Sequence, residues 1–152
     1  MKLEKEIKTD KFGSQFQRAS LSVIFTGVWL TDKFNAILKP YGISEQQYNV
    51  LRILKGQKGT PINLYSIQER MLHRMSNATR LVEKLRLKEY VKRETCENNR
   101  RKVEITLTEK GQELLVKIEK NIQSDGYLQE LLTKWTDEEA KQVGDLLDKL
   151  RE

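Results

Sequence analysis

The spacing of apolar residues along the chain predicts several helices. Over Ser14–Lys39 apolar residues recur at helical intervals, and Pro40 and Gly42 then end the run, so the pattern predicts a long first helix. A second helix is predicted over Ser44–Gly56, because its first serine and the glutamine three positions later form a capping-box signature. The first third of the chain is therefore expected to be largely helical.

Two further helices are expected in the middle of the chain. Pro61–Leu64 predicts a brief extended segment, Tyr65–Leu72 a short third helix and Ser76–Leu87 a fourth helix. One face of the fourth helix is apolar and suits a core, with Ala78, Leu81, Val82 and Leu85. The opposite face is polar and charged, with Ser76, Arg80 and Glu83 at its centre and Asn77, Thr79 and Lys84 beside them.

A β-hairpin is predicted after the fourth helix. Tyr90–Thr95 and Lys102–Leu107 alternate apolar and polar residues, and the run Cys96–Arg101 between them is rich in turn-forming residues. The predicted tip carries the consecutive basic residues Arg100, Arg101 and Lys102, which suit contacts with phosphates or a minor groove. Two helices followed by a basic hairpin predict a winged helix-turn-helix. The expected fold class is therefore mainly α with a small β-hairpin wing.

The last part of the chain predicts two amphipathic helices. Thr108 can cap a helix that runs to about Ser124, and Thr136 with Glu139 forms a second capping box. Their apolar stripes are Leu114, Leu115, Ile118 and Ile122 in the first, and Val143, Leu146, Leu147 and Leu150 in the second. A single winged-helix core is too small to cover these stripes and the long first helix. We therefore expect the terminal helices of two chains to pack together in a symmetric homodimer.

Basic residues are concentrated in one segment of the 152-residue chain. The formal net charge is +6, whereas Arg70–Lys102 alone holds eleven basic and four acidic residues. A nearly neutral scaffold with one basic segment is typical of a protein that docks that segment on a polyanion. Asn and Arg side chains, as on the fourth helix, can make bidentate contacts to base edges in a major groove. Double-stranded DNA is therefore the expected partner.

The residue types give little support to enzymatic or metal chemistry. One cysteine and one histidine cannot by themselves form a zinc site or an activated nucleophile, and no phosphate-binding loop, dinucleotide fingerprint or nucleophile elbow occurs. We expect no enzyme, catalytic residue, cofactor or metal. No apolar stretch approaches the roughly 20 residues of a membrane-spanning helix, and Met1–Lys11 alternates charges, so a cytoplasmic protein is expected.

These motifs together resemble the MarR-type transcriptional regulators, which are dimeric winged-helix proteins. The likeness covers most of the chain and rests on the stretches Ser76–Leu85, Asn99–Arg101 and Leu107–Gly111. It implies that Arg101 enters a minor groove and that the major-groove set is Ser76, Asn77, Thr79 and Arg80. With the neighbouring basic residues, the candidate DNA-binding set is Arg74, Ser76, Asn77, Thr79, Arg80, Lys84, Arg100, Arg101 and Lys102.

Two residues depart from the pattern of that family. Asn99 stands where an aspartate is usual, so the wing arginine is expected to be held more loosely. Glu89 stands where a glycine often follows the recognition helix. Because glutamate tolerates a left-handed backbone poorly, the turn into the wing is expected to differ in form or to carry strain.

The resemblance also implies an organisation and a mode of regulation. Residues 1–40 and 109–152 are expected to dimerise and residues 41–108 to bind DNA, all within one continuous folding unit. Such a dimer predicts a pseudo-palindromic operator with half-sites about 10 bp apart. Our interpretation is a repressor that occludes a promoter by binding it. A small aromatic or phenolic effector would release it. Phe25, Trp29 and Tyr48 are candidates to line the effector pocket, although helical spacing makes such residues core residues first.

Two alternative functions remain open at this point. A winged-helix protein–protein adaptor would not require the basic surplus, and an architectural DNA-binding protein would bind without sequence preference. Salt-sensitive DNA binding separates the adaptor from the regulator. Cys96 is expected to be an incidental thiol, and His73 a turn or packing residue.

Overall fold

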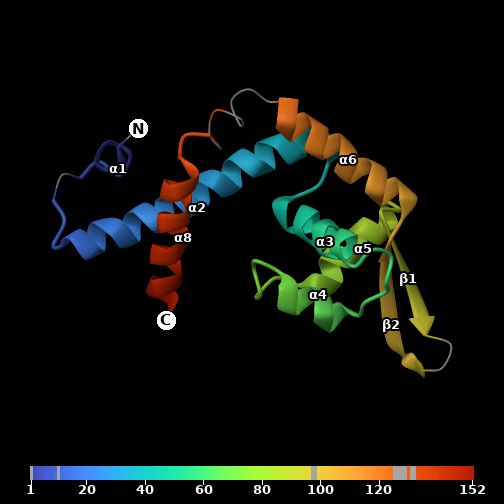
Figure 1. The fold of residues 1–152 in the computed structure, drawn as a ribbon. Helices are drawn as coiled ribbons and strands as arrows, with labels where there is room; N and C mark the ends of the chain where they lie inside the picture. The colour runs from blue at the N-terminus through green and yellow to red at the C-terminus, as the bar shows by residue number, and fades with distance from the viewer. Residues whose placement is uncertain (1, 10, 97–98, 125–129, 131–132) are drawn as a thin grey trace. The chain divides into compact units, whose positions relative to one another are not determined.

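The structure is a computed structural model that describes residues 2–9, 11–96, 99–124, 130 and 133–152, without the side chains of residues 96 and 99–102. Contacts among the residues divide the chain into two units, residues 1–112 and 113–152. The described part is mainly helical and contains one two-stranded antiparallel sheet (Figure 1). The predicted fold class is therefore confirmed.

A long helix follows the N-terminal segment, as the apolar spacing predicts. The first elements are α1 (Leu3–Glu6), α2 (Gln15–Leu38) and the 3-10 turn η1 (Lys39–Tyr41). Ser14 caps α2, because its side chain accepts a hydrogen bond from the Gln17 amide at 3.1 Å. The run ends at Gly42, whose φ of 65° is a left-handed conformation that costs glycine little.

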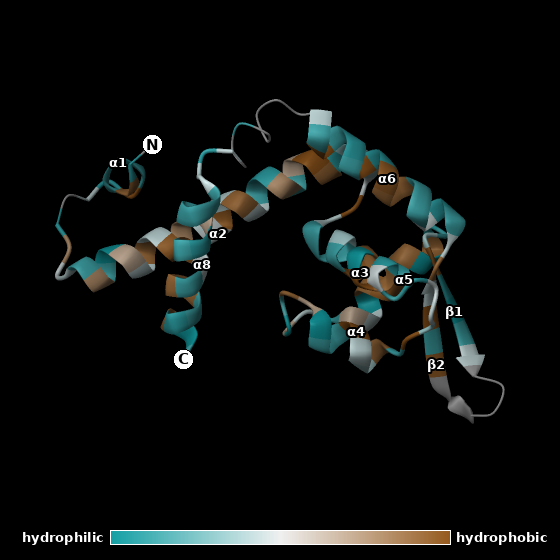
Figure 2. Ribbon diagram, viewed as in Figure 1, coloured by the Kyte–Doolittle hydropathy of each residue, from teal (hydrophilic) through white to brown (hydrophobic). Residues whose placement is uncertain are grey.

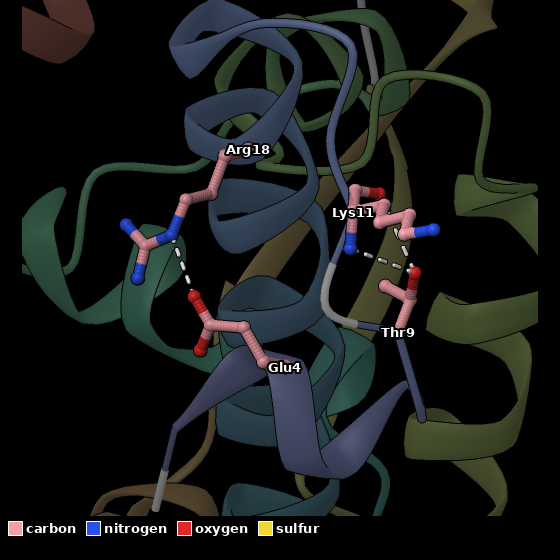
Figure 3. A network of polar contacts seen from close by, with 4 residues as sticks. All are labelled: Glu4, Thr9, Lys11 and Arg18. Carbon is pink, nitrogen blue, oxygen red and sulfur yellow. Dashed lines mark hydrogen bonds and ion pairs between the residues drawn. The ribbon is translucent and has the colours of Figure 1, made fainter.

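Polar contacts connect α1 to the start of α2. Figure 3 shows the Arg18 guanidinium donating to Glu4, with Nε and Oε1 2.7 Å apart. A backbone hydrogen bond and this arginine lower the pKa of the Glu4 carboxyl. In the segment between the two helices, Thr9 exchanges hydrogen bonds with the Lys11 backbone (Figure 3).

Three helices of the first unit surround an apolar core. They are α3 (Glu45–Gly56), α4 (Leu64–Arg70) and α5 (Ala78–Leu87). The predicted capping box is present on α3, because Ser44 Oγ accepts from the Gln47 amide at 3.3 Å and Gln47 Oε1 accepts from the Ser44 amide at 3.0 Å. The core consists of almost wholly buried side chains that include Val50, Leu51, Leu54, Ile67, Val82, Leu85 and Ile105.

The predicted hairpin is present after α5. It consists of β1 (Val91–Cys96) and β2 (Asn99–Leu107), in a register that opposes Val91 to Leu107 and Arg93 to Ile105. The predicted extended segment before α4 is also present, because Ile62 exchanges backbone hydrogen bonds of 3.1 and 2.8 Å with Ile105. This bridge fixes the base of the hairpin to the loop that follows α3.

The two predicted C-terminal helices form as well. They are α6 (Glu109–Ser124) and α8 (Asp137–Arg151). The Thr108 hydroxyl accepts from the Gly111 amide at 3.0 Å at the start of α6, and Thr136 with Glu139 forms the predicted capping box on α8. Leu115 and Ile118 on α6 are fully buried, whereas no residue of α8 is buried.

The length and composition of α2 correct one expectation. Figure 2 shows apolar residues along the whole helix, and of its 24 residues, all described, only Leu38 is buried. Because charged residues are sparse, Gln15–Tyr41 is long and apolar enough to cross a membrane, contrary to the prediction that no such stretch exists. The same length and composition also occur in helices that pack inside soluble proteins.

Candidate nucleic-acid interface

The candidate recognition helix, α5, places polar side chains opposite a buried face. Ala78, Val82 and Leu85 are at most 1% exposed, whereas the predicted DNA-binding residues Thr79, Arg80 and Lys84 are exposed. The spacing of the buried residues holds α5 against the core. The other face is therefore free of core contacts and available to a partner.

The helix begins two residues later than the sequence predicts. Asn77 rather than Ser76 ends the preceding turn, because Asn77 Oδ1 accepts a hydrogen bond from the Arg80 amide at 3.0 Å and caps the helix. Ser76 lies half-buried in the turn, so the prediction that it belongs to the helix is wrong. The carboxamide of Asn77, a candidate base-reading group, already performs a structural task.

The turn before α5 is held by contacts with two helices, α3 and α4. Its backbone closes through the Ser76 amide and the His73 carbonyl oxygen, 3.0 Å apart. Asn49 Oδ1 of α3 accepts from the Leu72 amide at 3.0 Å, and Gln68 Nε2 of α4 donates to the Arg74 carbonyl oxygen at 3.0 Å. The fixed turn carries the exposed side chain of the candidate Arg74. Asn49 and Gln68 are positioning residues that no sequence motif indicates, and Asn49 lies 23 residues from its partner Leu72.

A histidine gives the third connection. His73 Nε2 lies 3.6 Å from Glu45 Oε2 at the start of α3, and the Glu45 amide donates to Asn35 Oδ1 of α2 at 3.0 Å. His73 thus lies in a turn, as the sequence predicts.

The acidic residue on α5 is neutralised within the helix. Arg86 binds Glu83 through two hydrogen bonds of 3.0 and 2.8 Å, which lower the pKa of the Glu83 carboxyl. A carboxylate on this face would otherwise repel phosphates. The pairing leaves the basic side chains Arg80 and Lys84 to set the local charge.

A left-handed residue ends α5 and directs the chain into the hairpin. The Tyr90 amide donates to the Leu85 carbonyl oxygen at 3.0 Å and the Glu89 amide to that of Arg86 at 2.8 Å, the two bonds of a Schellman motif. Glu89 has a φ of 63°, so the expectation of a strained turn at this glutamate is confirmed. Lys88 also donates to the Gly42 carbonyl oxygen and so connects the end of α5 to the end of η1.

The same turn contacts the start of α6. The Thr108 hydroxyl donates to the Glu89 carbonyl oxygen at 2.7 Å, and Lys110 Nζ lies 2.6 Å from Glu89 Oε2. The hydrogen bond from Lys110 to the Glu89 carboxylate and the charge of Lys110 lower the pKa of the Glu89 carboxyl. A Cβ at Gly111 would overlap with the Tyr90 carbonyl oxygen, so only glycine fits this close approach.

The predicted basic tip lies at the far end of the hairpin. The backbone of Arg100, Arg101 and Lys102 belongs to β2, which begins three residues earlier than predicted, and the register shifts between Thr95 and Cys96. The side chains of these three residues and of Cys96 lie outside the described part of the structure.

The candidate effector residues are not brought together around one described cavity. Phe25, Trp29 and Tyr48 are each half-buried, and Lys33 Nζ lies 5.8 Å from the centre of the Trp29 ring. An open cavity of about 540 Å³ lies where α2 meets the start of α3, and its lining residues are Asp32, Asn35, Ala36, Lys39, Gly42, Ile43 and Ser44. Among the residues that the structure describes, no cluster of His, Cys, Asp and Glu could hold a metal ion.

Comparison with known proteins identifies this arrangement. Residues 43–103, which run from the start of α3 into β2, match the model of the MarR family. This segment is therefore similar to the MarR family, and its structure is a winged helix. The transcriptional repressor MprA of Escherichia coli is 31% identical over 86 residues, which cover 57% of this chain and 49% of MprA. The chain thus spans about half the length of the curated MprA relatives that it matches.

Solved MarR structures extend the likeness over nearly the whole chain. A MarR transcription factor from Planctomyces limnophilus is 27% identical, with a TM-score of 0.68 over 93% of this chain and 98% of that chain. A MarR variant from Escherichia coli complexed with operator DNA has a TM-score of 0.76 at 20% identity, over 93% of this chain and 99% of that chain. The MarR-type fold predicted from the motifs is therefore confirmed.

Proposed function

We propose that this chain is a transcriptional repressor that binds double-stranded DNA as a homodimer and occludes a promoter. The observation that carries the proposal is α5, which exposes Thr79, Arg80 and Lys84 opposite its buried face. It lies in the segment Arg70–Lys102, where eleven residues are basic and four acidic. Arginine binds guanine edges and threonine can donate or accept, so the exposed face of α5 suits a major groove.

The hairpin supplies the second contact of this proposal. The three basic residues at its tip, Arg100, Arg101 and Lys102, suit phosphates and a narrow minor groove. Arg74, Ser76 and Asn77, at the N-terminal end of α5, complete the proposed interface. A solved MarR variant of similar fold is bound to operator DNA, which supports the same use of the fold here.

The proposed dimer rests on apolar side chains that the chain itself leaves uncovered. Phe16, Ile24 and Val28 on α2 are 69%, 63% and 59% exposed, and Leu146 and Leu150 on α8 are 66% and 50% exposed. Apolar stripes of this kind on terminal helices suit a two-fold interface with a second copy. A protein partner, rather than lipid, would then cover α2, in accord with a cytoplasmic regulator that has no enzymatic activity.

Release by a small effector is the finer part of the proposal. A small aromatic or phenolic molecule near Phe25, Trp29 and Tyr48 would have to bind the DNA-free form of the dimer more tightly than the DNA-bound form. Such a preference would favour a form of the dimer in which the distance between the two recognition helices no longer matches the spacing of the operator half-sites.

A selection experiment tests the proposed function. The full chain is incubated with a pool of randomised duplexes at two salt concentrations, and the bound sequences and the number of bound chains are determined. We expect a two-fold-related motif with half-sites about 10 bp apart, bound by two chains and weakened by salt. Salt-sensitive binding without a motif would indicate an architectural DNA-binding protein instead. No binding at either salt concentration would favour the alternative function, a protein–protein adaptor.

A further inference from the structure

A fully exposed methionine lies at the start of the candidate recognition helix. Met75 is 99% exposed, although methionine is usually buried. It lies two residues before Asn77, the residue that caps α5. An apolar side chain that lies wholly in water beside a proposed binding face stabilises a complex when the partner covers it.

The turn that contains Met75 is held in place by hydrogen bonds. The residue lies inside the turn that the Ser76 amide closes on the His73 carbonyl oxygen, at 3.0 Å. The neighbouring residues of the turn are held by Asn49, Gln68 and Glu45, through contacts of 3.0, 3.0 and 3.6 Å. Because the backbone just before Met75 is tied to α3 and α4 and the backbone just after it closes on His73, the turn needs little ordering when it binds.

The chemistry of its surroundings narrows the choice of partner. Arg74 precedes Met75, and the exposed Arg80 and Lys84 follow on α5. An exposed apolar side chain that is flanked in the sequence by basic ones suits a polyanion that also offers an apolar group. In the major groove of DNA the apolar group among the base edges is the C5 methyl of thymine.

We propose that Met75 is a specificity-determining residue that contacts a thymine methyl group in each operator half-site. The inference rests on the proposed function, since it requires that the N-terminal end of α5 enters the major groove. It predicts that each half-site contains one thymine that the protein recognises through its methyl group and not through a hydrogen bond.

The test replaces thymine by deoxyuridine, which lacks only the C5 methyl group. Each thymine of the selected operator is replaced in turn in both half-sites, and the Kd of the full chain is measured at one salt concentration. We expect one symmetric position at which the replacement weakens binding about four-fold per half-site, the factor that corresponds to one buried methyl group. At that position Met75→Ala should bind thymine and deoxyuridine equally, whereas Met75→Leu should keep the preference.

Leu87→Ala is the matched control. Leu87 is also an exposed apolar residue, 69% exposed, but it lies at the opposite end of α5, so its loss should leave the thymine preference unchanged. The proposal is overturned if no thymine is sensitive to the replacement, or if Met75→Ala retains the sensitivity. Operator binding that persists in either case leaves the proposed function standing, whereas absence of any selected operator overturns both.

Discussion

The carboxylate of Glu89 lies 2.6 Å from the ammonium group of Lys110, while the backbone of Glu89 is in a left-handed conformation. The ion pair is exposed on both sides and is screened by solvent. The left-handed backbone is unfavourable for any residue with a Cβ. The two effects oppose each other, and we expect the backbone term to dominate.

Replacing Glu89 by glycine should therefore stabilise the protein. Glycine adopts the φ of 63° without steric cost, and we expect Glu89→Gly to raise Tm by roughly 2–4 °C. Thermal unfolding followed by circular dichroism measures the shift. The matched control is Glu113→Gly, in the helix α6, which should lower Tm because glycine weakens a helix. A decrease for both variants would show that the ion pair outweighs the strain.

The ion pair between Glu89 and Lys110 should make the thermal stability of the chain depend on pH. Lys110 lowers the pKa of Glu89 in the folded chain. The contribution of the ion pair to the stability of the fold is therefore fully present above the unfolded carboxyl pKa of about 4.3. It is lost as the pH falls through the lower, folded value. The Tm of the natural chain should exceed that of Glu89→Gln near pH 7, and the difference should shrink as the pH falls below about 4.3. A difference that stays constant over this range would contradict the pairing.

The close approach at Gly111 should make this residue sensitive to a single methyl group. In Gly111→Ala the Cβ would overlap with the Tyr90 carbonyl oxygen, and we expect a loss of about 1–3 kcal/mol in the free energy of unfolding. Gly56→Ala is the control, because a Cβ there meets nothing within 4 Å. Denaturant titration of both variants checks the prediction, which fails if the two behave alike.

Asn77 requires a variant that separates capping from base reading. Asn77→Ala should lower the free energy of unfolding by about 1 kcal/mol, because the cap on the Arg80 amide is lost. Asn77→Ser keeps a capping oxygen but removes the carboxamide. If Asn77 also reads a base, Asn77→Ser should retain stability yet relax the preference at one operator position. Unchanged sequence preference in that variant would limit Asn77 to its structural role.

Local signals in the sequence account for the elements that could be predicted. The capping boxes at Ser44 and Thr136 lie within four consecutive residues, and the stripe on α5 repeats within one helix. The predicted start of α5 differs from the observed one because Ser76 and Asn77 are both good capping residues. Two hydrogen bonds in the structure distinguish them: the Arg80 amide donates to Asn77 Oδ1, and the Ser76 amide donates to the His73 carbonyl oxygen.

The contacts that position the candidate interface could not be predicted in the same way. Asn49 and Leu72 lie 23 residues apart in sequence, and Lys88 and Gly42 lie 46 apart. Such pairs depend on how helices pack, and a single sequence carries no local pattern for them. The prediction that the turn at Glu89 differs in form or carries strain depends only on the glycine that often stands at its position in the family pattern.

The most direct test of the central claim is the dependence of affinity on half-site spacing. The full chain is titrated with the selected operator and with the same operator carrying five additional base pairs between its half-sites. The insertion turns the second half-site to the opposite face of the duplex, so a dimer with two fixed recognition helices should lose most of its affinity. Equal affinity for both duplexes would contradict a homodimer that reads two half-sites at once.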